Sequence, residues 1–453
     1  MKEKNIKTKE PIMINAANTG NSGTMQKEKF DKVNRQEKIE SYIERLSKGE
    51  SLETVRKDFV ENFKDVSVHE IVHVEQNIIK KGTPLSKVQR LCDVHSALFH
   101  GRTEAEIYKE EEQNNVPIYI MKLENKEIQK RIKQLEKINN ELLTRFGQLS
   151  EEMMIEIRKK RENKENDTAE ITTIKSLIEI LKNMLSELKN IGKHYGKKEE
   201  LFFPKLCEYG YKGPSDVMWG VDDEIKGDIS FLYKFIDIDN FLHYKNNLKR
   251  LIDRIKEMIY KEEKILFPLA LNNFTKDDWK EVYADYDEMG YAFINDIPRW
   301  KDAACWIESK EGAASSESIA DAIGSGIIKM PTGELTIKQL VAMFAIIPID
   351  FTFIDKDDIL RFFTNNEKVF ARPLSALGRK IYTCHPPRII PVVEAMLGDF
   401  KTKCNDKMEM WIDKPDNPVK VIYHAVYDDK GEYIGTLEMV QSFKDAKEHF
   451  ASK

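Results

Sequence analysis

The sequence predicts a multidomain chain with a small all-α domain, a four-helix bundle and an α+β domain, in that order. Its 453 residues are too many for a single hydrophobic core. Apolar residues recur at helical spacing through most of residues 31–310. After Leu335 the pattern changes to short alternating stretches separated by turn residues, which are typical of strands.

The domain boundaries follow from local composition. Residues 1–30 are polar and contain NAANTGNSGT, which predicts a disordered tail. The small helical domain is expected at residues 31–103 and the bundle at residues 104–310. Small and polar side chains at residues 311–332 predict a linker, and residues 333–449 form the expected α+β domain.

Four amphipathic stretches predict the helices of the bundle, because each repeats apolar residues on one helical face. We call each such row of apolar residues a stripe. The first stripe contains Ile118, Met121, Ile128, Ile132, Leu135, Leu142 and Phe146, and the second contains Leu177, Leu181, Met184, Leu188, Ile191 and Tyr195. The third contains Ile225, Ile229, Leu232 and Phe235, and the fourth contains Leu248, Ile252, Ile255, Ile259 and Leu266. FTKDDWKEVYADYDEMGYAFI predicts a further helix after Phe274.

Two strand pairs predict the antiparallel sheet of the last domain. IDFTFIDKDDILRFFT is expected to form a strand, a turn at Asp355–Asp358 and a second strand. VKVIYHAVYDDKGEYIGTLEMVQSF repeats this plan around the turn residues DDKG. Short helical pieces are expected between the two pairs.

Composition excludes several classes of protein. A net charge of −5 gives no general attraction to nucleic acid, and no run of eighteen apolar residues predicts a membrane span. The five cysteines are scattered without a CxxC pair, which favours a reducing, cytoplasmic location. No P-loop, dinucleotide-binding glycine motif or nucleophile elbow occurs, so we do not expect an enzyme.

One short phrase occurs twice, as KEELFFP at Lys198–Pro204 and KEEKILFP at Lys261–Pro268. It resembles the Glu-Glu-x-x-Phe-Pro signature of hemerythrin-like (HHE cation-binding) bundles. GYKGPSDVMWGVDDEI is similar to the loop and third helix of one subfamily, which has a helical domain of unknown function before the bundle and a PAS sensor domain after it. LCDVHSALFHG is similar to the first of these domains, and DFTFIDKDD, GRKIYTCHPP and GEYIGTLEMVQ are similar to the second. The resemblance covers residues 31–449.

The resemblance implies a bundle whose helices present histidine and glutamate toward a shared di-iron centre. It also leads us to expect that Phe-Pro ends each ligand-bearing turn, because proline cannot continue the hydrogen-bonding pattern of a helix. Val116, Tyr119 and Met258 stand where the family has histidines, and Asp222 takes another histidine position. The remaining candidate ligands are His194, Glu199, Asp222 and Glu262.

One imidazole is too few for a hemerythrin di-iron centre, and thioether and phenol groups are poor substitutes. We therefore expect a bundle that keeps its fold and has lost di-iron. The alternative is a single metal ion held by His194 and the three carboxylates. A further hypothesis is that an ion pair between Lys198 and Glu262 replaces the metal; otherwise both side chains reach solvent.

In the PAS domain, Cys384 and His385 are candidate heme ligands. The alternatives are a small organic ligand or none, with His-Pro simply starting the next helix. The function expected first is that of a cytoplasmic sensory or regulatory protein, whose PAS domain senses a ligand or redox state. The alternative is an iron- or oxygen-binding protein for iron handling, oxygen or NO response, or iron-centre repair. The partner is expected to be a protein or a small molecule, and a homodimer is compatible with both domain types.

Overall fold

The computed structural model describes residues 115–149, 168–307, 326–364, 369–412 and 417–451, together with parts of residues 37–88. The predicted tail at residues 1–30 lies outside the described residues. The chain divides into two compact units. The first comprises Met1–Tyr195, Lys205–Phe274 and Ala292–Asp296, and the second comprises Gly196–Pro204, Thr275–Tyr291 and Ile297–Lys453.

The described part of the leading domain contains helix α2 (Leu52–Asn62). The Ser51 hydroxyl accepts a hydrogen bond from the backbone N–H of Thr54 at 3.2 Å and so caps the start of this helix. The ring of Tyr42 packs edge-on against Phe59, with ring centroids 5.2 Å apart. These contacts confirm a helical segment here.

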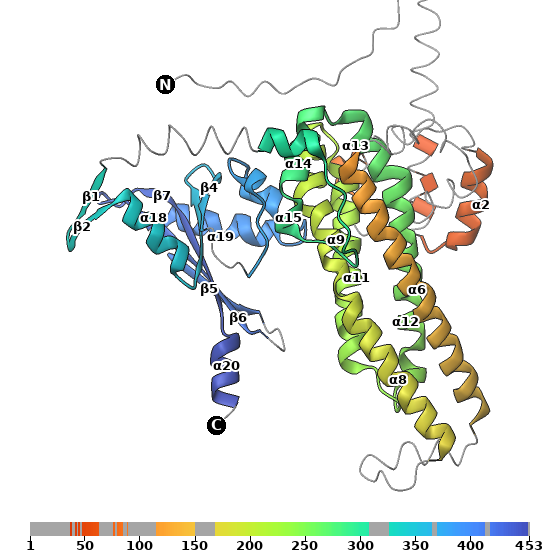
Figure 1. The fold of residues 1–453 in the computed structure, drawn as a ribbon. Coiled ribbons are helices and arrows are strands. Elements are labelled where there is room, and N and C mark those ends of the chain that lie inside the picture. Colours follow the sequence, from red (N-terminus) through yellow and green to blue (C-terminus); the bar gives the residue numbers. More distant parts are fainter. Residues whose placement is uncertain are drawn as a thin grey trace, which may run out of the picture. The chain divides into compact units, whose positions relative to one another are not determined.

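Four long helices form the bundle: α6 (Val116–Gln148), α8 (Ala169–Leu188), α11 (Lys212–Phe235) and α12 (Phe241–Lys261). Figure 1 shows them running side by side, and α6 and α11 each contact both α8 and α12. Most residues of the predicted stripes are buried in the core. Phe235 is an exception at 45% exposed, because it lies at the end of α11.

The two copies of the repeated phrase form π-helical turns. Helix α9 (Ile191–Lys197) continues through η3 (Lys198–Phe202) into α10 (Phe203–Glu208). Helix α12 continues through η4 (Glu262–Leu266) into α13 (Phe267–Asn273). Each of these turns ends immediately before Phe-Pro, but the expectation that proline cannot continue the helix there was wrong.

The wide π-turn explains how the chain passes a proline. In an α-helix, the proline ring collides with the carbonyl group four residues earlier. Here the N–H of Phe203 bonds to the carbonyl of Lys198, and the N–H of Phe267 bonds to that of Glu262, in each case five residues back. This spacing enlarges the turn just before Pro204 and Pro268, and π-turns of this kind are frequent at functional sites.

The second unit contains two antiparallel sheets. Strands β1 (Ile327–Met330) and β2 (Gly333–Thr336) form a hairpin, so part of the predicted linker is a strand. The larger sheet has the order β4-β3-β7-β6-β5. Its strands are β3 (Asp350–Asp355), β4 (Leu360–Phe363), β5 (Lys407–Ile412), β6 (Val419–Tyr427) and β7 (Tyr433–Ser442).

The second unit also contains helices. They are α14 (Lys276–Ala284), α15 (Tyr286–Met289), α18 (Ile337–Ile346), α19 (Ile390–Thr402) and α20 (Lys444–Ala451), with 3-10 turns at Leu374–Ala376 and Ile381–Cys384. Both predicted strand pairs are confirmed as β3–β4 and β6–β7. The helix predicted after Phe274 is α14, which begins with a capping box at Thr275.

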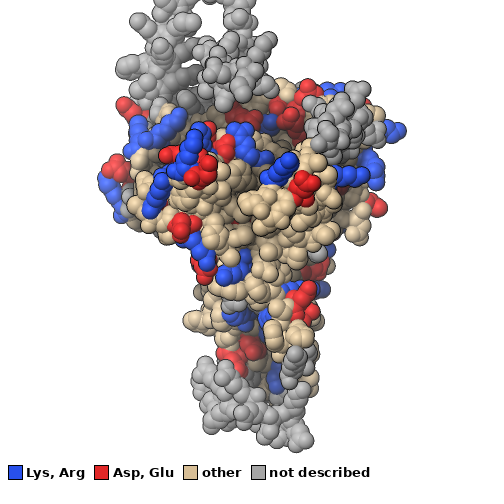
Figure 2. Space-filling view, turned by 90° about the vertical axis from the view of Figure 1, so that its left-hand side faces the viewer, with Lys and Arg blue, Asp and Glu red and all other residues tan. Residues whose placement is uncertain are grey.

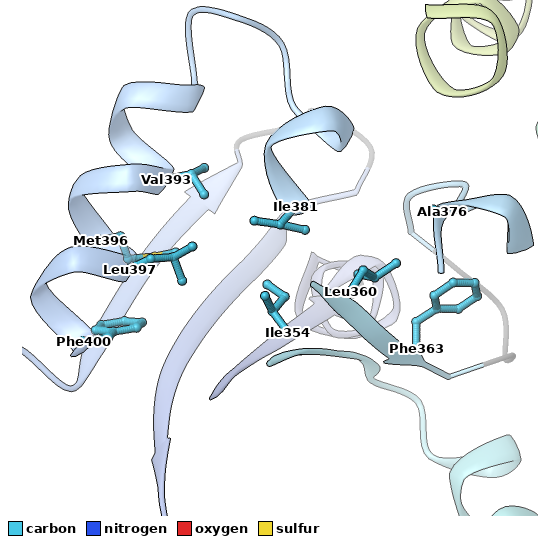
Figure 3. Close-up of a cluster of buried hydrophobic side chains, with 9 residues drawn as sticks. All are labelled: Ile354, Leu360, Phe363, Ala376, Ile381, Val393, Met396, Leu397 and Phe400. Atoms are coloured by element: carbon cyan, nitrogen blue, oxygen red, sulfur yellow. The ribbon is translucent and has the colours of Figure 1, made fainter. Parts of the chain in front are cut away.

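Two apolar clusters lie on one face of the large sheet, here called the inner face. The larger cluster, shown in Figure 3, joins strands β3 and β4 to helix α19; it contains Ile354, Leu360, Phe363, Ala376, Ile381, Val393, Met396, Leu397 and Phe400. The smaller cluster contains Val419, Val421 and Val440. On the opposite face, Phe344 of α18 packs against Phe351 and Phe362, with ring centroids 6.0 and 5.5 Å apart.

Basic and acidic side chains are interspersed over the face of the molecule seen in Figure 2. This mixture agrees with a composition of 72 lysine and arginine against 77 aspartate and glutamate residues. None of the helices in the described ranges is long and apolar enough to cross a membrane.

Asp216, near the start of α11, makes stability depend on pH. Burial raises the pKa of its carboxyl to about 6, although Lys212 opposes this effect. A carboxyl whose pKa is higher in the folded state costs stability as pH rises from about 4 to about 6. We expect Asp216→Asn to raise the free energy of unfolding near pH 7 by about 1–3 kcal/mol and to leave it unchanged below about pH 4.

Urea unfolding at a series of pH values measures this effect, with exposed Asp253→Asn as the control. A gain for Asp216→Asn that is equal at acidic and neutral pH contradicts the assignment.

Candidate functional site

A histidine held between two carboxylates lies in the core of the bundle. Nδ1 of His194 lies 2.7 Å from Oε2 of Glu124, and Nε2 lies 3.0 Å from Oε2 of Glu262. All three side chains are fully buried. We call this group the His194 triad.

Three different segments bring the triad together. Glu124 lies on the buried stripe of α6 between Met121 and Ile128, three and four residues away. His194 is on α9, and Glu262 is the first residue of the π-turn η4. The second oxygen of Glu124 accepts a hydrogen bond at 2.7 Å from the backbone N–H of Ala292. Glu124 is thereby fixed on both of its oxygens.

The carboxylates keep His194 positively charged. Burial by itself lowers the pKa of the imidazole, but Glu262 and Glu124 together outweigh that effect, and the net pKa is raised. Each ring nitrogen of an imidazolium carries a proton, so each donates to one carboxylate. The triad therefore places an imidazole with a raised pKa between two acidic side chains.

The structure brings together two of the four predicted ligands, His194 and Glu262. Asp222 is fully buried on α11, and Glu199 is 7% exposed in the π-turn η3. Neither provides the carboxylates that hold the imidazole. Sequence reasoning missed Glu124, although a charged residue on the apolar stripe of the first helix was a visible signal. The Lys198–Glu262 ion pair stays a prediction, since the two residues belong to different units.

The second predicted site, Cys384 and His385, lies at the end of a 3-10 turn in the second unit. Burial raises the pKa of the Cys384 thiol to about 12, so the thiol is protonated near neutral pH. Nδ1 of His385 lies 2.9 Å from the carbonyl oxygen of Ile381. A carbonyl only accepts hydrogen bonds, so Nδ1 carries a proton, and Nε2 is the ring nitrogen that this contact leaves available.

Family models match three parts of the chain. A family of unknown function (DUF438) matches residues 39–105, the hemerythrin HHE cation binding domain matches residues 116–270, and a PAS domain matches residues 340–444. The chain combines a hemerythrin-type domain with a PAS domain. These matches confirm the predicted set of domains and their order. The two domain types are cation-binding and sensory rather than typical of enzymes.

Solved structures resemble about a quarter of the chain. A C-terminal domain from Streptococcus mutans is 31% identical, with a TM-score of 0.26 over 27% of this chain and 96% of that one. A sensory box sensor histidine kinase from Vibrio cholerae is 7% identical, with a TM-score of 0.19 over 23% of this chain and 89% of that one. A PAS domain from Colwellia psychrerythraea is 13% identical, with a TM-score of 0.20 over 24% and 98%. A search of curated proteins finds no match.

The donor set does not fit a hemerythrin di-iron centre. Among the described residues of the bundle, the buried imidazole is that of His194, and both of its nitrogens already contact carboxylates, whereas iron needs an unprotonated nitrogen. Tyr119 is 40% exposed and Met258 is buried, at positions where the family has histidines. Within the described residues, no group of three or more histidine, cysteine, aspartate or glutamate side chains is arranged to hold a metal ion.

Of the two candidate heme ligands, His385 suits ligation of heme iron better than Cys384 does. The high pKa of Cys384 disfavours thiolate-ligated heme, because the iron would have to displace the thiol proton. A histidine-ligated heme would be held by Nε2 of His385. Its Nδ1–H bond to a backbone carbonyl is the orientation that ligating histidines commonly have.

Removing the imidazolium should destabilise the bundle. His194→Leu leaves Glu124 and Glu262 buried without their cation, and we expect the free energy of unfolding to fall by about 3–5 kcal/mol. The triple variant Glu124→Gln, His194→Leu, Glu262→Gln should recover much of this loss, because no unpaired charge remains buried. Urea unfolding with a chelator present measures both variants.

The matched control is His243→Leu, since His243 is exposed on α12 and its replacement should change stability by no more than about 0.5 kcal/mol. Equal losses for the two histidine variants would show that the triad contributes nothing.

The cysteines should differ in reactivity toward iodoacetamide. Burial raises the pKa of Cys207 to about 11 and that of Cys384 to about 12, while Cys305 and Cys404 are exposed. Because the thiolate is the reactive form, we expect Cys305 and Cys404 to be alkylated in the native protein and the other two only after unfolding. Mass spectrometry of tryptic peptides measures each site. Native labelling of Cys384 at the rate of Cys404 would restore thiolate-ligated heme as a candidate.

Proposed function

We propose that the protein is a sensory or regulatory protein, in which the PAS domain responds to a small ligand and passes the change to helical segments of the chain. The observation that carries this proposal is one short segment, Arg372–Arg379, which we call the read-out segment. It bonds both to the inner face of the PAS sheet and to helical residues of the same unit.

At its start, the read-out segment is fixed to the sheet. Nη2 of Arg372 donates to Oε2 of Glu438 on β7 at 2.6 Å. The side chains of Arg372 and Glu438 are 18% and 10% exposed, so water screens this ion pair only partly. A ligand that alters Glu438 therefore alters the position of Arg372.

In its middle, the read-out segment is held by Asp285, which stands between α14 and α15. The backbone N–H groups of Leu374 and Ser375 donate to the two carboxylate oxygens of Asp285 at 2.9 and 3.2 Å. Asp285 itself is 5% exposed. Hydrogen bonds to a buried charged group are among the stronger ones, about 1.5–3 kcal/mol each.

At its end, the read-out segment reaches the first π-turn. Nη1 of Arg379 donates to the backbone carbonyl of Glu200 at 3.0 Å. Glu200 lies four residues before Pro204, which has no N–H with which to form the usual helical bond. The arginine thus adds a charged donor to the backbone of the π-turn, close to the proline. Glu200 is also six residues after His194 in the sequence, on the same continuous helical stretch.

In this proposal the hemerythrin-type bundle keeps its fold without di-iron, and the charge of the His194 triad replaces that of the metal. The triad supports it because both ring nitrogens of His194 already have carboxylate partners. The second candidate function, iron or oxygen binding, is supported by the buried carboxylates Glu124, Asp222 and Glu262. It requires that a metal displace the imidazole proton.

Metal analysis of protein purified without oxygen separates these two functions. We expect less than about one iron in ten chains, because a protonated imidazole does not bind a metal. An ultraviolet–visible spectrum of the same sample tests for heme through its Soret band. Near-stoichiometric iron that is lost on Glu262→Gln would replace the sensory proposal for the bundle with the second function.

Hydrogen exchange tests the read-out segment. Arg379→Ala leaves the Glu200 carbonyl without its side-chain donor, and we expect amides near Pro204 to exchange about 5–30 times faster, for a bond to a charged group. The control is Arg361→Ala on β4, an exposed arginine paired with Asp355. Equal exchange near Pro204 in both variants would contradict the proposed connection.

A further inference from the structure

We propose that Thr352, Glu438 and Tyr423, together with Arg372, form a subsite on the inner face of the PAS sheet for the polar head group of a small, uncharged organic molecule. This inference rests on the proposed sensory function, because it names the chemistry of the ligand that the PAS domain would detect. We call these four residues the polar subsite.

Strand pairing places three of these residues in one row. Thr352 on β3 pairs with Glu438 on β7, and Glu438 pairs with Tyr423 on β6. Directly paired residues of antiparallel strands point to the same face of a sheet. The row ends in Phe363 on β4 and Met408 on β5, which pair with Thr352 and Tyr423. A polar centre is therefore flanked by apolar side chains.

The row lies between the two apolar clusters of the inner face. Ile354 and Phe363, neighbours of Thr352, belong to the larger cluster seen in Figure 3. Val421 and Val440, which precede and follow the polar row by two residues on their strands, belong to the smaller one. Tyr423 packs against both clusters. A ligand at this row would bury its body among apolar side chains and present its head to the polar subsite.

Within the polar subsite, the positive charge of Arg372 already balances the negative charge of Glu438. Oε2 of Glu438 accepts from Arg372 at 2.6 Å, and Oε1 accepts from the Tyr423 hydroxyl at 3.1 Å. Both carboxylate oxygens are thus occupied. A carboxylate ligand would bring an additional buried negative charge beside Glu438, and an amine would add an additional positive one beside Arg372. An uncharged head group avoids both costs.

Thr352 supplies the remaining hydrogen-bonding capacity. Its side chain is 1% exposed, and its Oγ1 has no hydrogen-bond partner among the described residues. A buried hydroxyl without a partner is costly, and such a group calls for an explanation. Because a hydroxyl both donates and accepts, it matches the same dual capacity of an alcohol, a phenol or a carboxamide.

The first experiment measures binding to the full-length chain by saturation-transfer NMR. The probes are two pairs of similar shape that differ in charge: benzamide and benzoate, and acetamide and acetate. We expect at least one amide to bind, each carboxylate to bind more weakly than its amide, and Thr352→Val to weaken amide binding about fivefold. Thr402→Val is the control, because the Thr402 hydroxyl is exposed on α19 and bonds to its own helix at 2.8 Å.

Failure of both amides to bind would overturn the polar subsite. Carboxylates that bind as well as the amides, or a Thr352→Val variant that binds like the control, would also overturn it.

The second experiment needs no ligand. If the Thr352 hydroxyl is unsatisfied in the free protein, Thr352→Val should raise the thermal midpoint, since an apolar group of the same shape removes the cost. A lowered midpoint would show that the hydroxyl already has a partner, such as an ordered water, and would reject the subsite.

These tests are separable from that of the proposed function. Amide binding that leaves hydrogen exchange near Pro204 unchanged would support the polar subsite and reject transmission through the read-out segment. Absent amide binding, with the Arg379→Ala effect intact, would reject the subsite alone.

Discussion

The bundle depends on an imidazolium placed between two carboxylates, all three of them fully buried. Neither charge type is tolerated alone at such a position, because desolvating an unpaired ion costs several kcal/mol. Glu124 and Glu262 would repel each other across the core, and His194 converts this repulsion into two hydrogen bonds. The backbone N–H of Ala292 then holds Glu124 from the other side. A network in which each charged group has its partner gives the helices one preferred arrangement, which apolar packing alone specifies less strictly.

The need to balance buried negative charge also relates this hemerythrin-type domain to cation-binding bundles. In a cation-binding bundle, inward carboxylates are balanced by metal ions. In the proposed function, a proton on His194 supplies this positive charge, and the neighbouring carboxylates raise the pKa of that imidazole. In the second unit an arginine has a similar role, since Arg372 neutralises Glu438 within the PAS domain. Both sites thus keep acidic side chains buried by placing a cation of the chain against them.

The sequence predicted the architecture well because apolar periodicity and turn residues are local signals. The stripes of α6 and α12 and the hairpins around Asp355–Asp358 and DDKG could be recognised directly. Strand β5 was missed because KMEMWI consists largely of residues that favour helices. Within the His194 triad, His194 and Glu262 could be predicted from the family pattern. Glu124 could not, because its place on the apolar stripe indicates only burial, whereas its contact with His194 depends on how the helices pack. The row of Thr352, Glu438 and Tyr423 likewise appears only once the register of three strands is known.

The repeated phrase has a geometric consequence beyond its proline. Each π-turn contains one residue more than an α-helical turn, and a single added residue rotates everything after it by about 100° around the helix axis. Residues before and after the turn therefore follow two different phases of the same helical repeat. Around η3 this produces an almost unbroken run of buried residues from Lys197 to Leu206, interrupted only at Glu200. In each of these two helical stretches, the apolar face can therefore point in one direction before the π-turn and in another direction after it.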